Sequence, residues 1–499
     1  MSEQTPLWDV PVAPAAHGDL PETCDDLVIG AGIAGLTTGL LLARAGRRVS
    51  IVEGRYAGAG ATGRSSAKVT LLQGTRLSTL LEKHDRDLVG AYVDANRAGF
   101  DWLVEFSEAH GVRIDRRTAA TFAAQPSQVA QARAEYVAAQ AMGLPVEWVD
   151  QLDEPFTTHG AATLADQAQV DPATLVAALV TQFRRAGGVL VEDARVEHVS
   201  WAGTPRATLA DGRQVAPKSM VVTTGTPILD RSMAFADLEP SKSYLVAYEL
   251  DAPPTTMALS AGSPTLSLRE ARTTDGRPVL LVGGHGHTVG RTSSEHEHVE
   301  ALRTWTAEHF PQARELAAWS AQDYTTADGL PRFGRMPRGG GHIRFATGFA
   351  KWGFTNGPAA ALAIAGDILG ETPTSWAEAL THRSSPVVSI GERARINAGV
   401  AKEVATGVAG ALLRSDSPLA EGQGAVHREG AKLVAESNVG GRVRRVQGLC
   451  THLAGVLHWN DAEKTWDCPL HASRFAPDGQ VLNGPATRPL ACLDRDDQS

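Results

Sequence analysis

The sequence has few cysteines, no excess of basic residues and no long apolar run. Four cysteines among 499 residues are too few for a disulfide framework. Lysine and arginine number 47 against 56 acidic residues, which gives a net charge of −9, and no basic block is present. We therefore expect no nucleic-acid partner. The longest apolar stretches, 36–45 and 359–369, are shorter than the 18 or more residues typical of a membrane span. We therefore expect no membrane-spanning segment.

The first residues show no recognisable targeting signal. Residues 1–22 lack the basic start, the apolar core and the twin arginine of export signals. We therefore expect a cytoplasmic location. The apolar fraction of 43% and the charged fraction of 21% are typical of an ordinary globular protein.

Pattern changes divide the chain into four parts. After an N-terminal extension (1–24), short apolar runs alternate with helical patterns and Gly-rich turns over 25–382, which predicts an α/β domain. Residues 383–414, rich in Ala and Val, predict a linker helix. Over 415–499, short β-type runs at 425–426, 432–435 and 443–446 predict a small antiparallel all-β domain.

A nucleotide-binding pattern lies near the N-terminus. Gly30, Gly32 and Gly35 follow an apolar strand and open a helical run, and a second apolar run (49–52) ends in Glu53. In such a G-x-G-x-x-G loop the glycines allow a tight turn, close approach of a pyrophosphate, and close packing of helix on strand, while the acid accepts hydrogen bonds from a ribose hydroxyl. The pattern predicts a dinucleotide site, and a Gly-rich turn in a structural βαβ unit is the alternative.

Later motifs extend this pattern. They are residues 61–68, an apolar run (220–222) leading to Gly225, Asp328 to Pro331, and the Gly-rich segment 345–358 before a helix. Over 25–380 the chain resembles the FAD-dependent oxidoreductases of the D-amino acid oxidase, glycine oxidase and sarcosine oxidase superfamily. The resemblance implies an α/β, Rossmann-like FAD-binding domain with an inserted antiparallel-sheet substrate domain, mainly within 236–320. A second dinucleotide fingerprint is not visible, so we expect no bound NAD(P)H.

The resemblance also implies which residues line the flavin. In this superfamily the late Gly-rich turn directs a helix N-terminus at the flavin N1/C2=O edge, where reduced flavin is negatively charged. The predicted cofactor-binding residues are Gly30, Gly32, Ile33, Ala34, Gly35, Glu53, Gly54, Arg55, Thr62, Gly63, Arg64, Ser65, Ser66, Val196, Thr224, Gly225, Gly348, Gly353, Phe354, Thr355, Asn356 and Gly357.

Two cysteines and two histidines form a second constellation near the C-terminus. They occur as Cys450-x-His452 and Cys468-x-x-His471, separated by fifteen residues. These ligand types suit either a zinc ion or a Rieske cluster. The flanking residues, including Pro469 and Ser473, resemble the Rieske iron-sulfur domain over about 415–495.

The Rieske resemblance implies a role for each ligand. Cys450 and Cys468 would bind one iron and His452 and His471 the other. Ser473 would hydrogen-bond a cluster sulfur and so raise the potential. Gly455 and Leu470 occupy the two places where high-potential members carry a cysteine pair, so we expect a low or middling potential within the Rieske range of about −150 to +300 mV. The other two thiols, Cys24 and Cys492, are predicted to be small buried side chains.

The two cofactors together suggest a short relay. A flavin accepts two electrons from a C–H bond, and a 2Fe-2S cluster carries one at a time. The leading hypothesis is oxidation of an amine or amino acid C–N bond at FAD, with electrons passing through the cluster to an external acceptor: a redox protein, a quinone or oxygen. The substrate class comes from the resemblance alone.

Alternatives stay open at this point. One is a flavin/iron-sulfur electron-transfer reductase without an amine substrate, and a redox sensor is another. A Rieske oxygenase is disfavoured because no 2-His-1-carboxylate group stands out.

Four residues are weak catalytic candidates. Lys351 and Trp352 lie inside the Gly-rich flavin motif. Tyr244 could equally be one position of a half-buried strand, and His287, with His285, could belong to a Gly-rich turn. The sequence identifies no catalytic base.

Overall fold

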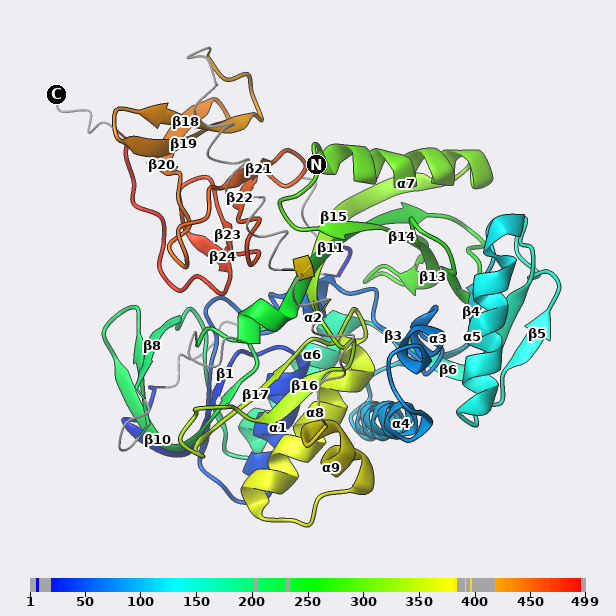
Figure 1. The fold of residues 1–499 in the computed structure, drawn as a ribbon, viewed down its shortest axis with the longest axis horizontal. Coiled ribbons are helices and arrows are strands. Elements are labelled where there is room, and N and C mark those ends of the chain that lie inside the picture. The colour runs from blue at the N-terminus through cyan, green and yellow to red at the C-terminus, as the bar shows by residue number, and fades with distance from the viewer. Residues whose placement is uncertain are drawn as a thin grey trace.

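The computed structural model describes residues 6–8, 19–200, 205–229, 234–383, 391, 395–396 and 418–494. Figure 1 shows two large sheets with their helices and, beside them in orange and red, a small β domain formed by the C-terminal residues. We call this small domain, residues 418–494, the cluster domain. Most of the predicted linker helix (383–414) lies outside the described residues.

The nucleotide-side sheet has eight strands with a parallel centre. β1 pairs in parallel with β2 and β10, and β10 pairs in parallel with β17, which confirms the Rossmann-like α/β domain that the resemblance implies. The order is β16-β17-β10-β1-β2-β7, and β9, paired with β8, joins β10. The strands are β1 (Thr23–Ile29), β2 (Val49–Val52), β7 (Val189–Val191), β8 (Val196–Ser200), β9 (Arg206–Leu209), β10 (Gln214–Val222), β16 (Arg332–Arg335) and β17 (Ile343–Thr347).

The second sheet has nine strands and is mostly antiparallel. Its order is β15-β11-β14-β13-β12-β4-β6-β3, with β5 on β6, and β12 and β4 pair in parallel. The predicted 236–320 segment supplies one end, and residues 68–170 supply the other. The strands are β3 (Lys68–Val69), β4 (Ile114–Phe122), β5 (Glu147–Val149), β6 (Ala161–Val170), β11 (Leu238–Glu249), β12 (Met257–Ser260), β13 (Leu266–Arg272), β14 (Pro278–Thr288) and β15 (Arg314–Thr326).

The helices cover these sheets. They are α1 (Ile33–Arg44), α2 (Ala61–Arg64), α3 (Arg76–Leu81), α4 (Arg86–Ala109), α5 (Val129–Ala141), α6 (Pro172–Arg185), α7 (Glu295–His309), α8 (Gly353–Leu369) and α9 (Ser375–Thr381). None of them combines the length and the apolar character that a bilayer span requires.

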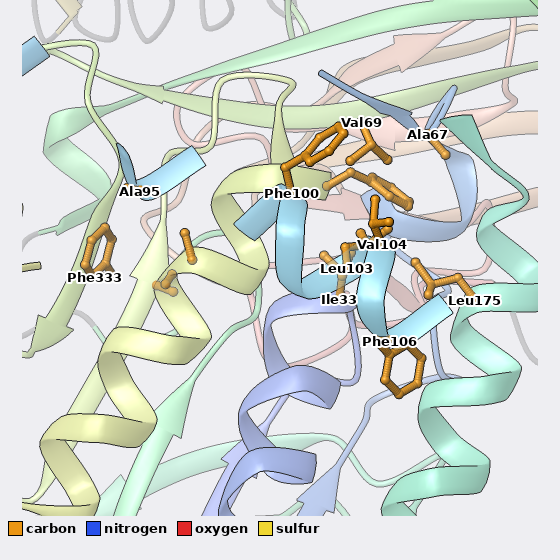
Figure 2. Close-up of a cluster of buried hydrophobic side chains, with 14 of the residues drawn as sticks. Ile33, Ala67, Val69, Ala95, Phe100, Leu103, Val104, Phe106, Leu175 and Phe333 are labelled. Atoms are coloured by element: carbon orange, nitrogen blue, oxygen red, sulfur yellow. The ribbon is translucent and has the colours of Figure 1, made fainter. Parts of the chain in front are cut away.

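Helix α4 shows how the sequence builds the core. The Asp85 side chain caps it by accepting from the Leu88 N–H. Apolar residues recur at helical spacing along one buried face. Figure 2 shows Phe100, Leu103 and Val104 of this helix beside Ile33 of α1 and Val69 of β3. This cluster ties the sheets together beneath the nucleotide loop.

The cluster domain consists of two small antiparallel sheets, which confirms the predicted all-β character. The first is β18 (Gly424–Glu429), β19 (Lys432–Val439) and β20 (Arg442–Gln447), and it contains all three predicted runs. The second is β21 (His458–Asn460), β22 (Thr465–Asp467), β23 (Arg474–Phe475) and β24 (Val481–Asn483). Cys24 is buried as predicted, but Cys492 is exposed, because it lies on a surface bridge to Val446 near the C-terminus.

Candidate functional site

A cavity of about 500 Å³ is lined by residues of both large sheets and of the cluster domain. Fifteen of the predicted cofactor-binding residues line it: Gly30, Gly32, Ile33, Ala34, Glu53, Gly54, Arg55, Thr62, Ser65, Ser66, Val196, Thr224, Gly225, Gly353 and Phe354. The others do not: Gly35, Gly63, Arg64, Gly348, Thr355, Asn356 and Gly357. The cavity therefore collects most of the predicted set, and their contact with FAD stays a prediction.

The glycine loop is built for close backbone approach. A Cβ on Gly35 would lie 2.0 Å from the Gly30 carbonyl oxygen. The first turn of α1 can therefore pack this closely on the end of β1 only with glycine at position 35. Gly30 has φ of +106°, a conformation that favours glycine. The Ile33 N–H donates to Thr62 Oγ1 at 3.0 Å, which fixes the start of α1. This cradle at a helix N-terminus fits the pyrophosphate of a dinucleotide.

Glu53 ties the end of β2 to the glycine loop. Its two carboxylate oxygens accept from the Ala31 N–H at 2.9 Å and from the Arg55 N–H at 3.0 Å. The carboxylate thus lies at the cavity wall beside the loop, the position in which an acid can also meet a ribose hydroxyl.

The N-terminus of α8 meets the cavity, as the Gly-rich motif predicts. Gly353 and Phe354 line it, whereas the Thr355 and Asn356 side chains turn away into a buried network. Thr355 Oγ1 donates to Asn96 Oδ1 at 2.6 Å, and Asn96 Nδ2 donates to Asn356 Oδ1 at 3.1 Å. These two residues therefore hold α8 against α4 rather than facing the cavity.

Arg64 and Gly348 also lie away from the cavity, for identifiable reasons. The Arg64 carbonyl accepts from Trp319 Nε1 at 2.9 Å, and its guanidinium donates to the Ser320 carbonyl at 3.4 Å, so Arg64 packs on β15. Gly348 forms a turn with φ of +73°.

The turn before α8 brings Lys351 and Trp352 to the cavity. Ala350 and Lys351 both have positive φ, and the turn is held by the Ala350 N–H donating to the Tyr324 carbonyl at 3.0 Å and by the Lys351 N–H donating to Asp323. Burial raises the pKa of Asp323 and lowers the pKa of Lys351. Lys351 lines the cavity and is exposed to solvent there.

Tyr244 and His287 form a pair at the substrate-side sheet. Tyr244 lines the cavity and is fully buried, and its Oη lies 2.9 Å from His287 Nε2. His287 Nδ1 lies 3.0 Å from the Thr288 carbonyl, which can only accept, so Nδ1 carries the proton and Nε2 accepts from Tyr244. Burial lowers the pKa of His287 to about 4 and raises that of Tyr244, so both are neutral at pH 7.

His287 itself does not line the cavity but supports Tyr244 from behind. It stacks on His298, with 4.4 Å between ring centroids. His285 and His287 belong to β14, not to the Gly-rich turn considered from sequence, because Gly283 and Gly284 pair within the strand ladder.

Lys68 places a buried positive charge in the cavity wall. Its Nζ donates to the Ala258 carbonyl and to Ser267 Oγ, both at 2.8 Å. Burial, with a contribution from Arg269, lowers the pKa of Lys68 to about 7. Both hydrogen-bond partners that the described chain supplies are neutral oxygens.

The four predicted cluster ligands lie on two adjacent loops. The Cys450 and Cys468 thiols are in hydrogen-bond contact, and the rings of His452 and His471 are 5.2 Å apart between centroids. The chain thus presents a thiol pair and an imidazole pair, the donor set that suits the two irons of a Rieske centre. Within the described residues, no three His, Cys, Asp or Glu side chains converge on a single metal-ion position.

Backbone hydrogen bonds hold the loops around these ligands. The Cys450 N–H donates to the Gly455 carbonyl and the Cys468 N–H to the Ser473 carbonyl, both at 2.8 Å. Ser473 is fully buried and contacts the Cys450 thiol. A Cβ on Gly455 would lie 2.6 Å from Leu470 Cγ, so these two positions face each other, as the Rieske resemblance implies.

Sequence reasoning missed several cavity residues. Lys68, Gln73, Arg76, Asp323 and Tyr324 line the cavity, and so do residues 482–484, 486 and 487 of the cluster domain. Lys68 is the last residue of the 61–68 motif, but the motif alone gave it no role. The others carry no local signal, because they reach the cavity only through tertiary packing.

Comparisons with known proteins agree with both halves of the site. A family model described as FAD dependent oxidoreductase matches residues 25–366, and one described as Rieske [2Fe-2S] domain matches residues 412–494. The putative Rieske 2Fe-2S iron-sulfur protein YhfW of Bacillus subtilis is 28% identical over 497 residues, 98% of this chain and 96% of that protein.

Solved structures with the same fold cover the larger part. Glycine oxidase from Geobacillus kaustophilus superposes with a TM-score of 0.61 at 21% identity, over 73% of this chain and 100% of the other. L-proline dehydrogenase from P. horikoshii superposes with a TM-score of 0.57 at 19% identity, over 71% and 95%.

The Rieske match decides between the cluster and the zinc ion that the ligand types alone left open. The chain belongs to the FAD-dependent oxidoreductase family, binds FAD, and carries a C-terminal Rieske domain for a 2Fe-2S cluster.

Proposed function

We propose that this protein oxidises the C–N bond of an amine or amino acid at its flavin and passes the electrons through its Rieske centre to an external acceptor. Bound FAD would accept a hydride equivalent from the carbon next to nitrogen, and the cluster would transfer electrons one at a time. The residues that support each part of this proposal lie around the same cavity.

The observation that carries the proposal is a direct contact between the cavity wall and a cluster loop. Gln322 and Tyr324 line the cavity. Gln322 Nε2 donates to the Ala472 carbonyl at 2.9 Å and to Tyr324 Oη at 2.8 Å, and Tyr324 packs on Ala472. Ala472 follows the predicted ligand His471 in the chain. The Gln322 side chain and the backbone of Ala472 therefore connect the cavity to that ligand.

Lys68 favours a substrate that carries an anionic group. A buried cation whose partners are neutral oxygens is stabilised when an anion approaches it. A carboxylate is the anion of an amino acid, so Lys68 supports an amino acid over a simple amine.

Tyr244 shapes the substrate end from within the wall. It is fully buried, and its ring stacks on His287 and His298, neither of which lines the cavity. Its hydroxyl donates to His287 Nε2, so it supports the position of β11 and leaves Lys68 as the group that favours an amino acid.

The test is an anaerobic titration of the holoprotein with a panel of amines, amino acids and N-substituted glycines. Flavin absorbance and low-temperature EPR are recorded on the same samples. Bleaching of the flavin together with a reduced Rieske signal is the expected result. A cluster that dithionite reduces, but that no panel member reduces, would contradict amine oxidation and favour the electron-transfer reductase.

A further inference from the structure

The cluster domain contributes part of the cavity wall. Residues Leu482, Asn483, Gly484, Ala486 and Thr487 line the same cavity as the glycine loop. They belong to β24 and the turn after it. In Figure 1 this domain lies against β11 and β15 of the substrate-side sheet.

These residues face the end of the cavity that holds Glu53, Gly54 and Val196. Arg195 spans the joint: its guanidinium lies over Gly54, 3.1 Å from where a Cβ there would be, and its Nη2 donates to the Val481 carbonyl at 2.8 Å. Thr487 Oγ1 donates to the carbonyl of Glu197, the neighbour of Val196, at 3.4 Å. The wall therefore covers the nucleotide end of the cavity, where the ribose-binding acid lies.

A buried set of four charges holds the cluster domain in this position. Lys242 of β11 is fully buried, and its Nζ contacts Asp467 at 2.6 Å and Glu463 at 2.7 Å. Arg474 contacts the same two carboxylates at 3.1 Å and 2.8 Å. Two cations balance two anions, and Lys242 is the member that comes from the other domain. Removing it leaves a buried uncompensated charge, which disfavours the docked state.

A second anchor lies at the start of α7. Asp461 of the cluster domain accepts from Ser294 Oγ at 2.7 Å, from the Glu295 N–H at 2.8 Å and from the His296 N–H at 3.0 Å. Neither Lys242 nor Asp461 lines the cavity. Both anchors thus act on docking without touching the space that FAD would fill.

We infer that the docked cluster domain is the cover of the nucleotide end of the FAD site, so that FAD retention depends on docking and docking depends on FAD. Undocking opens the wall formed by residues 482–487 and exposes the dinucleotide to solvent. The coupling is reciprocal, because the free energy by which docking strengthens FAD binding equals the free energy by which FAD strengthens docking. The inference holds for any substrate, since it concerns cofactor retention.

The first test uses Lys242→Met and Asp461→Ala, with Lys432→Met as the control because Lys432 is exposed in the same domain. FAD dissociation constants are measured by flavin fluorescence after removal and re-addition of FAD. EPR of the dithionite-reduced sample shows that the cluster domain is folded. We expect about tenfold or greater weakening of FAD binding in both anchor variants and none in the control. FAD binding within twofold of wild type in both variants, with the EPR signal retained, would overturn the inference.

The second test needs no variant and so decides the case if an anchor variant fails to fold. Hydrogen–deuterium exchange of the wild-type protein is compared with and without FAD over residues 458–467, which hold Asp461 and the two carboxylates that contact Lys242 and do not line the cavity. We expect several-fold slower exchange when FAD is bound. Equal exchange in the two states would contradict the coupling.

Discussion

The two ends of the cavity are built in different ways. At the nucleotide end the wall is mainly backbone from one βαβ unit, where Gly30, Gly32 and Glu53 lie within 24 residues of sequence. At the substrate end it is made of residues from distant strands, such as Lys68 on β3, Ser243 on β11 and Tyr324 on β15. The first end depends on the absence of side chains and the second on their chemistry. Substitutions at the two ends should therefore fail differently.

The largest effect is expected at the glycine loop. In Gly35→Ala the new Cβ meets the Gly30 carbonyl oxygen, and both atoms are held by backbone, so we expect loss of bound FAD and a fall in unfolding free energy of about 3 kcal/mol. Flavin content and thermal unfolding measure this. Gly90→Ala on α4, where nothing lies within 4 Å, is the control and should be neutral or slightly stabilising. Retention of FAD by Gly35→Ala would show that the loop adopts another conformation.

A smaller effect of a different kind is expected at Lys68. Lys68→Met should retain FAD and the Rieske signal but weaken binding of a carboxylate inhibitor such as benzoate by about thirtyfold, which is about 2 kcal/mol for a hydrogen bond to a charged group. Lys68→Arg should recover part of the loss. An unchanged dissociation constant in Lys68→Met would remove the carboxylate-binding role.

The pH dependence of inhibitor binding sharpens this test. The pKa of Lys68 is about 7, so the ammonium that attracts the carboxylate is present below that pH and is lost above it. We expect benzoate to bind wild type most tightly below pH 7 and more weakly as the pH rises towards 9. In Lys68→Met this slope should disappear. A slope that persists in the variant would assign it to another group.

Tyr244 should give a still smaller effect, on stability rather than on binding. Tyr244→Phe removes one buried neutral hydrogen bond to His287, so we expect the free energy of unfolding to fall by about 1 kcal/mol. Thermal unfolding of the holoprotein measures this change. Tyr136→Phe on α5, whose hydroxyl contacts Gln140 at an exposed site, is the control and should change less. Equal stability in Tyr244→Phe and wild type would mean that the hydrogen bond to His287 contributes nothing to folding.

The smallest change is expected in the cluster. Ser473→Ala removes a hydroxyl that contacts Cys450, so we expect the midpoint potential to fall by tens of millivolts, since about 1 kcal/mol corresponds to about 40 mV for one electron. EPR-monitored redox titration checks this. Cys492→Ser, at an exposed thiol, should leave the potential unchanged. A rise in Ser473→Ala would reverse the expected sign.

The sequence predicts best where a function depends on neighbours in the chain. The βαβ unit and the two ligand loops are short-range patterns, so Gly30 to Glu53 and Cys450 to His471 could be found by spacing. Tyr244 could not be told from an ordinary strand residue, because its place at the cavity depends on the packing of β11 against β15. The contact of Gln322 with Ala472 joins residues 150 positions apart, and no local pattern reports it. The motif predicts Thr355 and Asn356 as flavin-binding residues, and no local pattern shows that both of their side chains hydrogen-bond Asn96 in the core.

The most direct measurement is anaerobic rapid mixing of the holoprotein with a reducing amino acid, followed by freeze-quench EPR at several protein concentrations. If the contact from Gln322 to Ala472 marks the route from flavin to cluster, the Rieske signal appears after flavin bleaching at a rate independent of protein concentration. A cluster signal that grows in proportion to protein concentration, or that stays absent while the flavin is fully bleached, would contradict transfer within one molecule.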